Sequence, residues 1–189
     1  MTGLNFLLAK GENHLGSMIE ILISNRIRKY AWYSDISKMY NQLTLNKESL
    51  PYSLFLFSDK MDAEESPEIW SMCVAWYGVV PTGNQAGYAI ELLVKELGDD
   101  YPLTEDILLL KRYVDDILAG ADTEEERNDQ INQVQEILAK AGFKLKFVAL
   151  SGHSPCEKAS SDGSTMKVLG YSWLPEQDFF FARDGRDKL

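Results

Sequence analysis

The stretch ILLLKRYVDDILAG, residues 107–120, has the largest influence on the fold expected for this chain. Its adjacent acids, Asp115 and Asp116, stand between apolar runs whose length fits two β-strands joined by a tight turn. An Asp pair in a turn most often only bonds the local backbone, which is the purely structural explanation. Solvent-exposed turn residues are unexpected in such an apolar frame, however. On these residues alone, a chemical role for the pair is about as well supported as a simple turn.

A third carboxylate, Asp35, ends a strand that is predicted far upstream from the aromatic-rich segment KYAWYSDI. After it the sequence indicates a turn, a helix over 85–97, the two strands at the Asp pair, another helix and a strand over 143–150. This order fits an α+β fold, a split β-α-β antiparallel sheet with two helices packed on one face. The strands that carry the three carboxylates can then be neighbours.

Two helices have clear start signals. Residues 17–29 open with Ser17 and Glu20 as a capping box, and the apolar side chains at helical spacing are Met18, Ile19, Leu22, Ile23 and Ile27. A second capping box, Thr123 and Glu126, starts the helix that follows the Asp pair. The helix over 85–97 is instead recognised by its end, where Gly98 is placed for a left-handed residue.

Two other regions are predicted to form β-hairpins. Residues 51–57 and 70–77 are β-like runs, and an acidic, Pro-containing tip near Asp62 to Ser66 is expected to be exposed and mobile. Near the end of the chain, MKVLGYSWL and DFFFAR are predicted to pair around the residues PEQ.

Composition limits the class of protein. The 189 residues are 45% hydrophobic and 25% charged, which excludes a disordered or collagen-like chain. No apolar run reaches the roughly 18 residues of a membrane span, so no membrane partner is expected. The two cysteines, Cys73 and Cys156, show no metal or disulfide spacing. A reduced, cytoplasmic location is expected.

The charge distribution bears on possible partners. The net charge is −10, and residues 61–140 hold 18 of the 29 acidic residues. Binding to nucleic acid rests on contacts between Lys or Arg and phosphate, so weak and strongly salt-dependent binding is expected.

The three carboxylates suggest a metal site. Carboxylates forced together on adjacent strands repel one another, and a divalent cation relieves that repulsion. Mg²⁺ prefers oxygen ligands and completes its shell with water and substrate phosphate. Two ions, Mg²⁺ or Mn²⁺, about 3.5–4 Å apart can activate a hydroxyl and stabilise a leaving group in an in-line displacement.

A family resemblance covers nearly all of the chain. The segments RYVDDILAGADTEEE, EILAKAGFKLKF and VLGYSWLPEQD resemble the polymerase core of retroelement reverse transcriptases, most closely the Pao/BEL class of LTR retrotransposons. Upstream, LNFLLAKGENHL, IRKYAWYSDISKMYNQLTL and FLFSDKMDAEESPEIWSMCVAWYGVVPTG are similar to the finger and palm segments of the family, in the same order. The resemblance implies partial fingers over 1–30 and 47–84, a palm over 31–46 and 85–150, and a primer-grip-like hairpin within 151–189.

The resemblance also implies roles for single residues. Asp35, Asp115 and Asp116 match the catalytic, metal-binding carboxylates of the family. The other matching positions are those expected to contact the incoming nucleotide: Ile36 through its backbone, Tyr40 beneath the sugar, Pro81 and Gly83 beside the nascent base pair, and Lys144 or Lys146 near the triphosphate. The Tyr40 ring would exclude a ribose 2′-hydroxyl. The implied partners are an RNA or DNA template–primer and a dNTP.

The chain also departs from the family pattern. Thr82 stands where the family has a larger residue, and Gly87-Tyr88 replaces its Ser-Pro. A basic finger strand, the thumb, the connection and the RNase H region of the larger polyprotein are expected to be absent from this chain.

Three functions remain open from the sequence. The first is an RNA- and DNA-templated DNA polymerase core, either active or inactive on its own. The second is a relic or host-retained domain with a non-catalytic binding or scaffold role, favoured by the acidic charge. The third and weakest is another two-metal nucleotidyl-transfer enzyme on the same sheet, such as a nucleotide cyclase.

Overall fold

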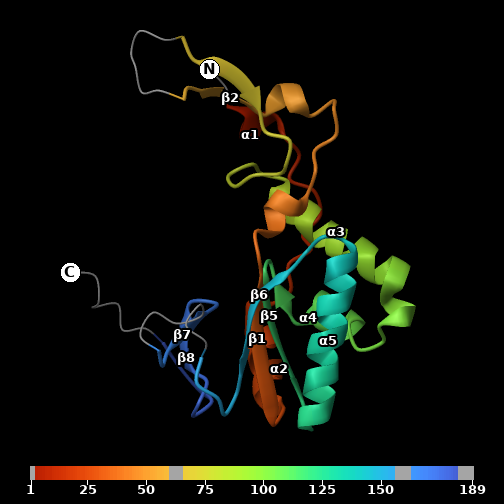
Figure 1. Ribbon diagram of the computed structural model, residues 1–189, viewed down its shortest axis with the longest axis vertical. Coiled ribbons are helices and arrows are strands. Elements are labelled where there is room, and N and C mark those ends of the chain that lie inside the picture. Colours follow the sequence, from red (N-terminus) through yellow and green to blue (C-terminus); the bar gives the residue numbers. More distant parts are fainter. Residues whose placement is uncertain (1–2, 60–65, 156–162, 183–189) are drawn as a thin grey trace, which may run out of the picture. The chain divides into compact units, whose positions relative to one another are not determined.

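The computed structural model describes residues 3–59, 66–155 and 163–182, and it combines helices with antiparallel β-sheets (Figure 1). The chain divides into two compact units. The first unit consists of residues 1–13 and 38–86, and the second of residues 14–37 and 87–189. The combination of helices and antiparallel sheets confirms the expected α+β class. The division into fingers and palm stays a prediction.

A four-stranded antiparallel sheet in the order β4-β5-β1-β6 forms the centre of the second unit. Its strands are β1 (Tyr30–Ile36), β4 (Arg112–Tyr113), β5 (Asp116–Ala121) and β6 (Leu145–Leu150). Strand β1 lies between β5 and β6, so Tyr33 pairs with Leu118 on one side and with Ala149 on the other. The strand that carries Asp35 and the strand that begins at Asp116 are therefore neighbours.

The two faces of this sheet are covered by different elements. The indole Nε1 of Trp32 donates a hydrogen bond of 3.0 Å to Oε1 of Gln130 on α5 (Glu124–Lys140). The next residue, Tyr33, belongs to a buried cluster with Ile21 of α2 (Met18–Ile27) and Trp173. Successive side chains of a strand point to opposite faces, so α5 and α2 lie on opposite sides of β1. This double burial explains the nearly continuous apolar sequence of β1.

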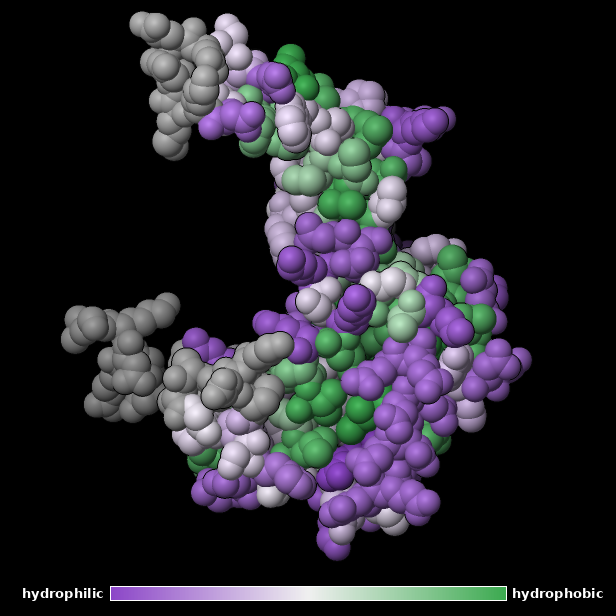
Figure 2. Space-filling model, in the orientation of Figure 1, coloured by the Kyte–Doolittle hydropathy of each residue, from purple (hydrophilic) through white to green (hydrophobic). Residues whose placement is uncertain are grey.

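Helix α5 begins at the predicted cap. The backbone N–H of Glu126 donates to Oγ1 of Thr123 at 3.2 Å. Its buried apolar side chains include Val134, Ile137 and Leu138, as their spacing indicates. Figure 2 shows hydrophilic residues over the outward face of this helix, in agreement with its acidic first turn.

Helix α2 also begins at its predicted cap but buries little of its apolar stripe. Ser17 accepts a hydrogen bond from the N–H of Glu20 at 3.4 Å. The helix buries Ile21 and Asn25, whereas Ile19 is 66% exposed. Apolar residues surround most of this helix, so their spacing alone did not indicate which side would face the sheet.

The apolar run before the Asp pair contains a helix. The prediction of a strand over Ile107–Leu110 was wrong, because these residues belong to α4 (Glu105–Leu110). Ile107 and Leu108 are buried by helical packing. A short apolar run does not distinguish a buried strand from a buried helix, and two acids in the first turn favour the helix.

Helix α3 (Thr82–Leu97) begins three residues earlier than predicted and ends differently. The prediction that Gly98 would be left-handed was wrong. The chain continues instead into the 3₁₀ turn η3 (Gly98–Asp100), in which the N–H of Tyr101 donates to the Gly98 carbonyl at 3.0 Å.

The C-terminal sheet has three strands where two were predicted. They are β7 (Met166–Val168), β8 (Tyr171–Leu174) and β9 (Phe179–Ala182). The run predicted as one strand over 166–174 is divided at Leu169 and Gly170, whose φ values are +47° and +85°. Two positive φ angles are typical of the tight turn of a two-residue β-hairpin.

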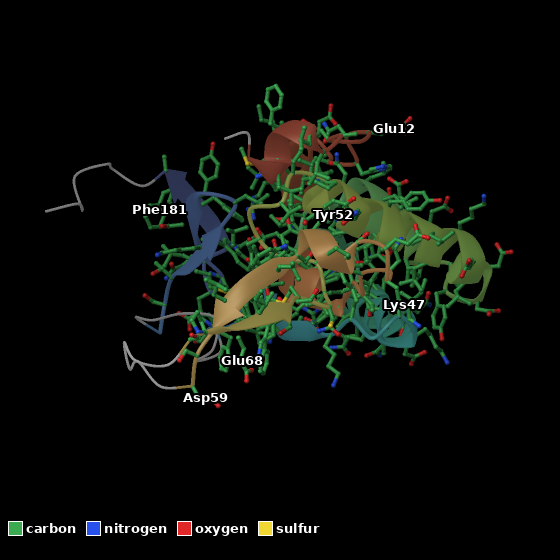
Figure 3. The ribbon with its side chains drawn as sticks, turned by 90° about the horizontal axis from the view of Figure 1, so that it is seen from above. Glu12, Lys47, Tyr52, Asp59, Glu68 and Phe181 are labelled. Atoms are coloured by element: carbon green, nitrogen blue, oxygen red, sulfur yellow. The ribbon has the colours of Figure 1, made fainter. Side chains whose placement is uncertain are left out.

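The first unit contains the other predicted hairpin. Its elements are α1 (Leu4–Leu7), η1 (Met39–Gln42), η2 (Leu50–Tyr52), β2 (Leu54–Phe57) and β3 (Glu68–Ser71). Strands β2 and β3 pair antiparallel, and Figure 3 shows Asp59 and Glu68 at the end of this hairpin. Most of the tip predicted to be mobile, Asp62 to Glu65, lies outside the described residues.

None of the helices in the described part of the chain is long and apolar enough to cross a membrane.

Candidate active site

The Asp pair lies at the turn between β4 and β5, but its two members have different positions. Tyr113 pairs with Asp116, so Val114 and Asp115 form the two-residue turn and Asp116 begins β5. Val114 has a φ of +56°, which is uncommon for a β-branched residue and indicates backbone strain. Such strain is typical of functional turns and persists only where the surroundings hold it.

The buried guanidinium of Arg112 supports this turn. Its Nη1 donates to the Val114 carbonyl at 2.6 Å, and its Nε donates to the Leu108 carbonyl of α4 at 3.0 Å. Arg112 is only 4% exposed, so burial lowers its pKa, while the carboxylates of Glu91 and Asp115 oppose that shift. Arg112 therefore connects the end of α4 to the strained turn.

The third carboxylate, Asp35, is brought to the same place by the sheet. Asp35 on β1 is the direct cross-strand partner of Asp116 on β5. The backbone N–H of Ile36 donates to the Asp115 carbonyl at 2.8 Å, which joins the turn to the end of β1. Three carboxylates separated by about eighty residues in sequence are thus neighbours in the second unit.

A β-bulge in β6 lies opposite Asp35. On the β6 side, Ser34 pairs with Val148 and Ile36 pairs with Leu145, so two residues of β6 face one residue of β1. Bulges bend a strand and change the direction of a side chain, and they are common beside active sites. This bulge marks Asp35 as a position where regular pairing is interrupted.

The three acids do not share one environment. Burial, and next the charge of Asp115, raise the pKa of Asp35, while the ammonium group of Lys146 opposes the rise. Burial raises the pKa of Asp116 to about 6, and the charges of Asp115 and Asp35 add to that rise. The Tyr33 hydroxyl works against it by donating a hydrogen bond of 2.6 Å to Oδ1 of Asp116.

The two predicted lysines lie at and near the start of β6. Both are exposed, and the carbonyl of Lys144 accepts a hydrogen bond of 2.8 Å from the N–H of Ser37. Lys146 is the one whose charge lowers the pKa of both Asp35 and Asp116. Its ammonium group therefore lies in the electrostatic field of the carboxylates.

The remaining predicted residues belong to the first unit. The hydroxyl of Tyr40 lies 3.7 Å from where a Cβ on Gly83 would be, and its ring meets that of Tyr77 edge-on with centroids 5.0 Å apart. Pro81 directly precedes α3, and its carbonyl accepts a hydrogen bond from the N–H of Gln85 at 2.9 Å. Tyr40 and Gly83 are thus brought together within this unit.

The donor set determines which cofactor the second unit could hold. Within residues 3–59, 66–155 and 163–182, no group of three or more His, Cys, Asp or Glu side chains is arranged to hold a metal ion. The repulsion between Asp35 and Asp115 is still the condition that a divalent cation relieves. A pair of carboxylates suits Mg²⁺, which commonly takes one or two carboxylates and fills its shell with water and phosphate.

Comparison with known proteins identifies the fold. No family model matches the sequence, and no curated protein matches it. The structure is similar to the solved structure of the foamy viral protease-reverse transcriptase in complex with an RNA/DNA hybrid, with a TM-score of 0.58 and 19% sequence identity. The match covers 89% of this chain and 19% of the solved chain. This is a reverse transcriptase-like fold.

Within the reverse transcriptase-like fold, two residues that bond Asp116 or its turn were not predicted as part of the carboxylate site. Tyr33 stands two residues before Asp35, and alternation along a strand could have placed both side chains on one face of the sheet. Arg112 directly precedes the YVDD segment, but its burial depends on α4, which was predicted as a strand. Nothing in the predicted hairpin therefore indicated that Arg112 would support the turn.

Proposed function

We propose that this chain is the core of a reverse transcriptase of the Pao/BEL class, an RNA- and DNA-templated DNA polymerase that uses two-metal nucleotidyl transfer. The observation that carries the proposal is the meeting of Asp35, Asp115 and Asp116 at a bulge and a strained turn. The reverse transcriptase-like fold supports it. Because the chain matches about a fifth of the solved protein, the activity of a whole polymerase is part of the proposal.

The proposed cofactor is a pair of Mg²⁺ or Mn²⁺ ions. Asp35 and Asp115 would hold the two ions, and Asp116 would be the third and less demanding carboxylate beside them. When bound, such ions lower the pKa of a hydroxyl nucleophile and stabilise charge on the leaving pyrophosphate. The N–H of Ile36 already donates to the Asp115 carbonyl. The backbone contact expected between Ile36 and the incoming nucleotide would therefore have to come from the Ile36 carbonyl.

The chain's own residues would orient the substrate. Lys146 is the better candidate for a contact with the triphosphate, since its charge acts on Asp35 and Asp116. Lys144 remains the alternative, on the same edge of the sheet. In the first unit, Tyr40 would exclude a ribose 2′-hydroxyl, and Pro81 and Gly83 would pass beside the base pair. The assignment is supported by the Tyr40 hydroxyl, which lies 3.7 Å from where a Cβ on Gly83 would be.

The proposed partners are an RNA or DNA template–primer and a dNTP. The solved neighbour is bound to an RNA/DNA hybrid. For this chain, a net charge of −10 leads us to expect weak binding that falls steeply with salt, because backbone affinity depends on Lys and Arg contacts.

Primer extension tests the proposal. The chain is incubated with an RNA template, a DNA primer, dNTPs and Mg²⁺ or Mn²⁺, beside Asp115→Asn as the inactive control. Extension by the parent and its loss in the variant are expected. Extension that survives the substitution would show a contaminating polymerase and contradict the assignment of the site.

The acidic charge favours one second candidate, a reverse transcriptase-like domain with a binding or scaffold role. In that case the parent would bind a labelled RNA/DNA hybrid at low salt without extending the primer. Asp115→Asn would then leave hybrid binding unchanged or improve it, since it removes a negative charge.

A further inference from the structure

Tyr33 occupies a fixed place beside the carboxylates. It is 5% exposed, and its ring packs against Phe147 and Trp173, with centroids 5.5 and 6.5 Å away. Its hydroxyl donates to Oδ1 of Asp116 at 2.6 Å and lies 3.5 Å from the Lys167 carbonyl of β7. A buried ring with these contacts gives the hydroxyl a fixed position, and the hydroxyl in turn holds one carboxylate oxygen of Asp116.

This bond distinguishes Asp116 from the other two acids. A hydrogen bond from a hydroxyl to a carboxylate is charge-assisted and therefore stronger than a neutral one. Across the described residues, no side chain donates a hydrogen bond to the carboxylate of Asp35 or Asp115. In the same residues no three His, Cys, Asp or Glu side chains form a group that could hold a metal ion.

We propose that Tyr33 is a positioning residue that holds Asp116 out of the metal shell, so that a divalent ion is held by Asp35 and Asp115 alone. The inference rests on the proposed function for the presence of the ion. Asp116 then acts as a hydrogen-bond acceptor and as a nearby negative charge. Its carboxylate is available to the ion only when the Tyr33 hydroxyl is removed.

Mn²⁺ binding, measured by electron paramagnetic resonance of the free ion at about pH 8, tests this without any turnover. At that pH Asp116, whose pKa is raised to about 6, is ionised. Asp35→Asn and Asp115→Asn should each weaken binding by about tenfold or more, whereas Asp116→Asn should change it by less than about threefold.

Tyr33→Phe removes only the hydroxyl and should free Asp116 to reach the ion. We expect it to tighten Mn²⁺ binding by about three- to tenfold, and Asp116→Asn in the Tyr33→Phe background should remove that gain. Tyr101→Phe, in the connection between η3 and α4, is the matched control and should bind Mn²⁺ like the parent.

Unfolding without metal gives a second readout. The double-mutant cycle of Tyr33→Phe and Asp116→Asn should be non-additive, because the first change removes the hydrogen bond and the second replaces its charged acceptor with a neutral amide oxygen. A purely structural Tyr33 would also give this result, but it would leave the Mn²⁺ affinity and its dependence on Asp116 unchanged. Non-additive unfolding together with an unchanged Mn²⁺ affinity in Tyr33→Phe would overturn the proposal.

The outcomes separate this inference from the proposed function. If Asp116→Asn weakens Mn²⁺ binding as much as Asp115→Asn does, Asp116 is a ligand and only this inference fails. If the parent binds no Mn²⁺ through Asp35 or Asp115, the proposed metal site and this inference fail together.

Discussion

Strands β1 and β2 are both rich in apolar residues, but they differ in what surrounds them. Strand β1 is paired on both edges and covered on both faces, and Trp32 and Ile36 are fully buried. Strand β2 has one partner, β3, and their shared face leaves Leu56 68% and Ile69 70% exposed. Strand β1 therefore has the rigid surroundings that precise placement of a carboxylate requires, whereas the exposed face of the hairpin contributes little to stability.

Truncation of one buried and one exposed side chain should show the largest difference. Trp32→Ala should cost about 3–5 kcal/mol of unfolding free energy, because it leaves a cavity in the core and removes the partner of Gln130. Leu56→Ala should cost less than about 1 kcal/mol. Urea unfolding followed by circular dichroism measures both, and a similar loss in the two variants would refute the contrast between the strands.

The carboxylates of the central sheet should make stability depend on pH. The folded state raises the pKa of Asp116 to about 6, so its neutral form is favoured on folding. Below about pH 4 the group is protonated in both states, and stability is then lost as the pH rises through about 6. Asp116→Asn should therefore be more stable than the parent by about 1–3 kcal/mol at pH 7, with the difference disappearing near pH 4.

The control for this pH effect is Asp59→Asn, at the exposed end of the β2–β3 hairpin. It should follow the parent at every pH. A stability gain for Asp116→Asn that stayed constant between about pH 4 and pH 8 would mean that repulsion and burial of the charge are not its cause.

The smallest expected effect is the response to metal. Millimolar Mg²⁺ or Mn²⁺ should raise the melting temperature of the parent by a few degrees, because the ion binds only the folded carboxylates. Asp115→Asn should abolish this rise and should also melt higher than the parent without metal, since a repelling charge is gone. Equal metal-induced shifts in both proteins would indicate only a generic effect on an acidic surface.

Much of the fold was predictable because the decisive signals are local. The caps at Ser17 and Thr123 are confirmed as hydrogen bonds, and the strand before Asp35 is present. Local signals failed where the same apolar run suits two structures. Residues Ile107–Leu110 are helical, and the run over 166–174 turns at Leu169 and Gly170. In both places packing determined the outcome, because isolated propensities are weak.

The sequence by itself determined that three carboxylates stand at a strand end and a tight turn, since alternation, turn chemistry and apolar framing are properties of neighbouring residues. Only the tertiary structure decided that Asp116, and not Asp115, pairs across the sheet with Asp35, and that Tyr33 holds it. Register, the bulge opposite Asp35 and the burial of Arg112 arise from contacts between distant segments. A one-residue change of register reverses every side chain of a strand, so these features had to come from packing.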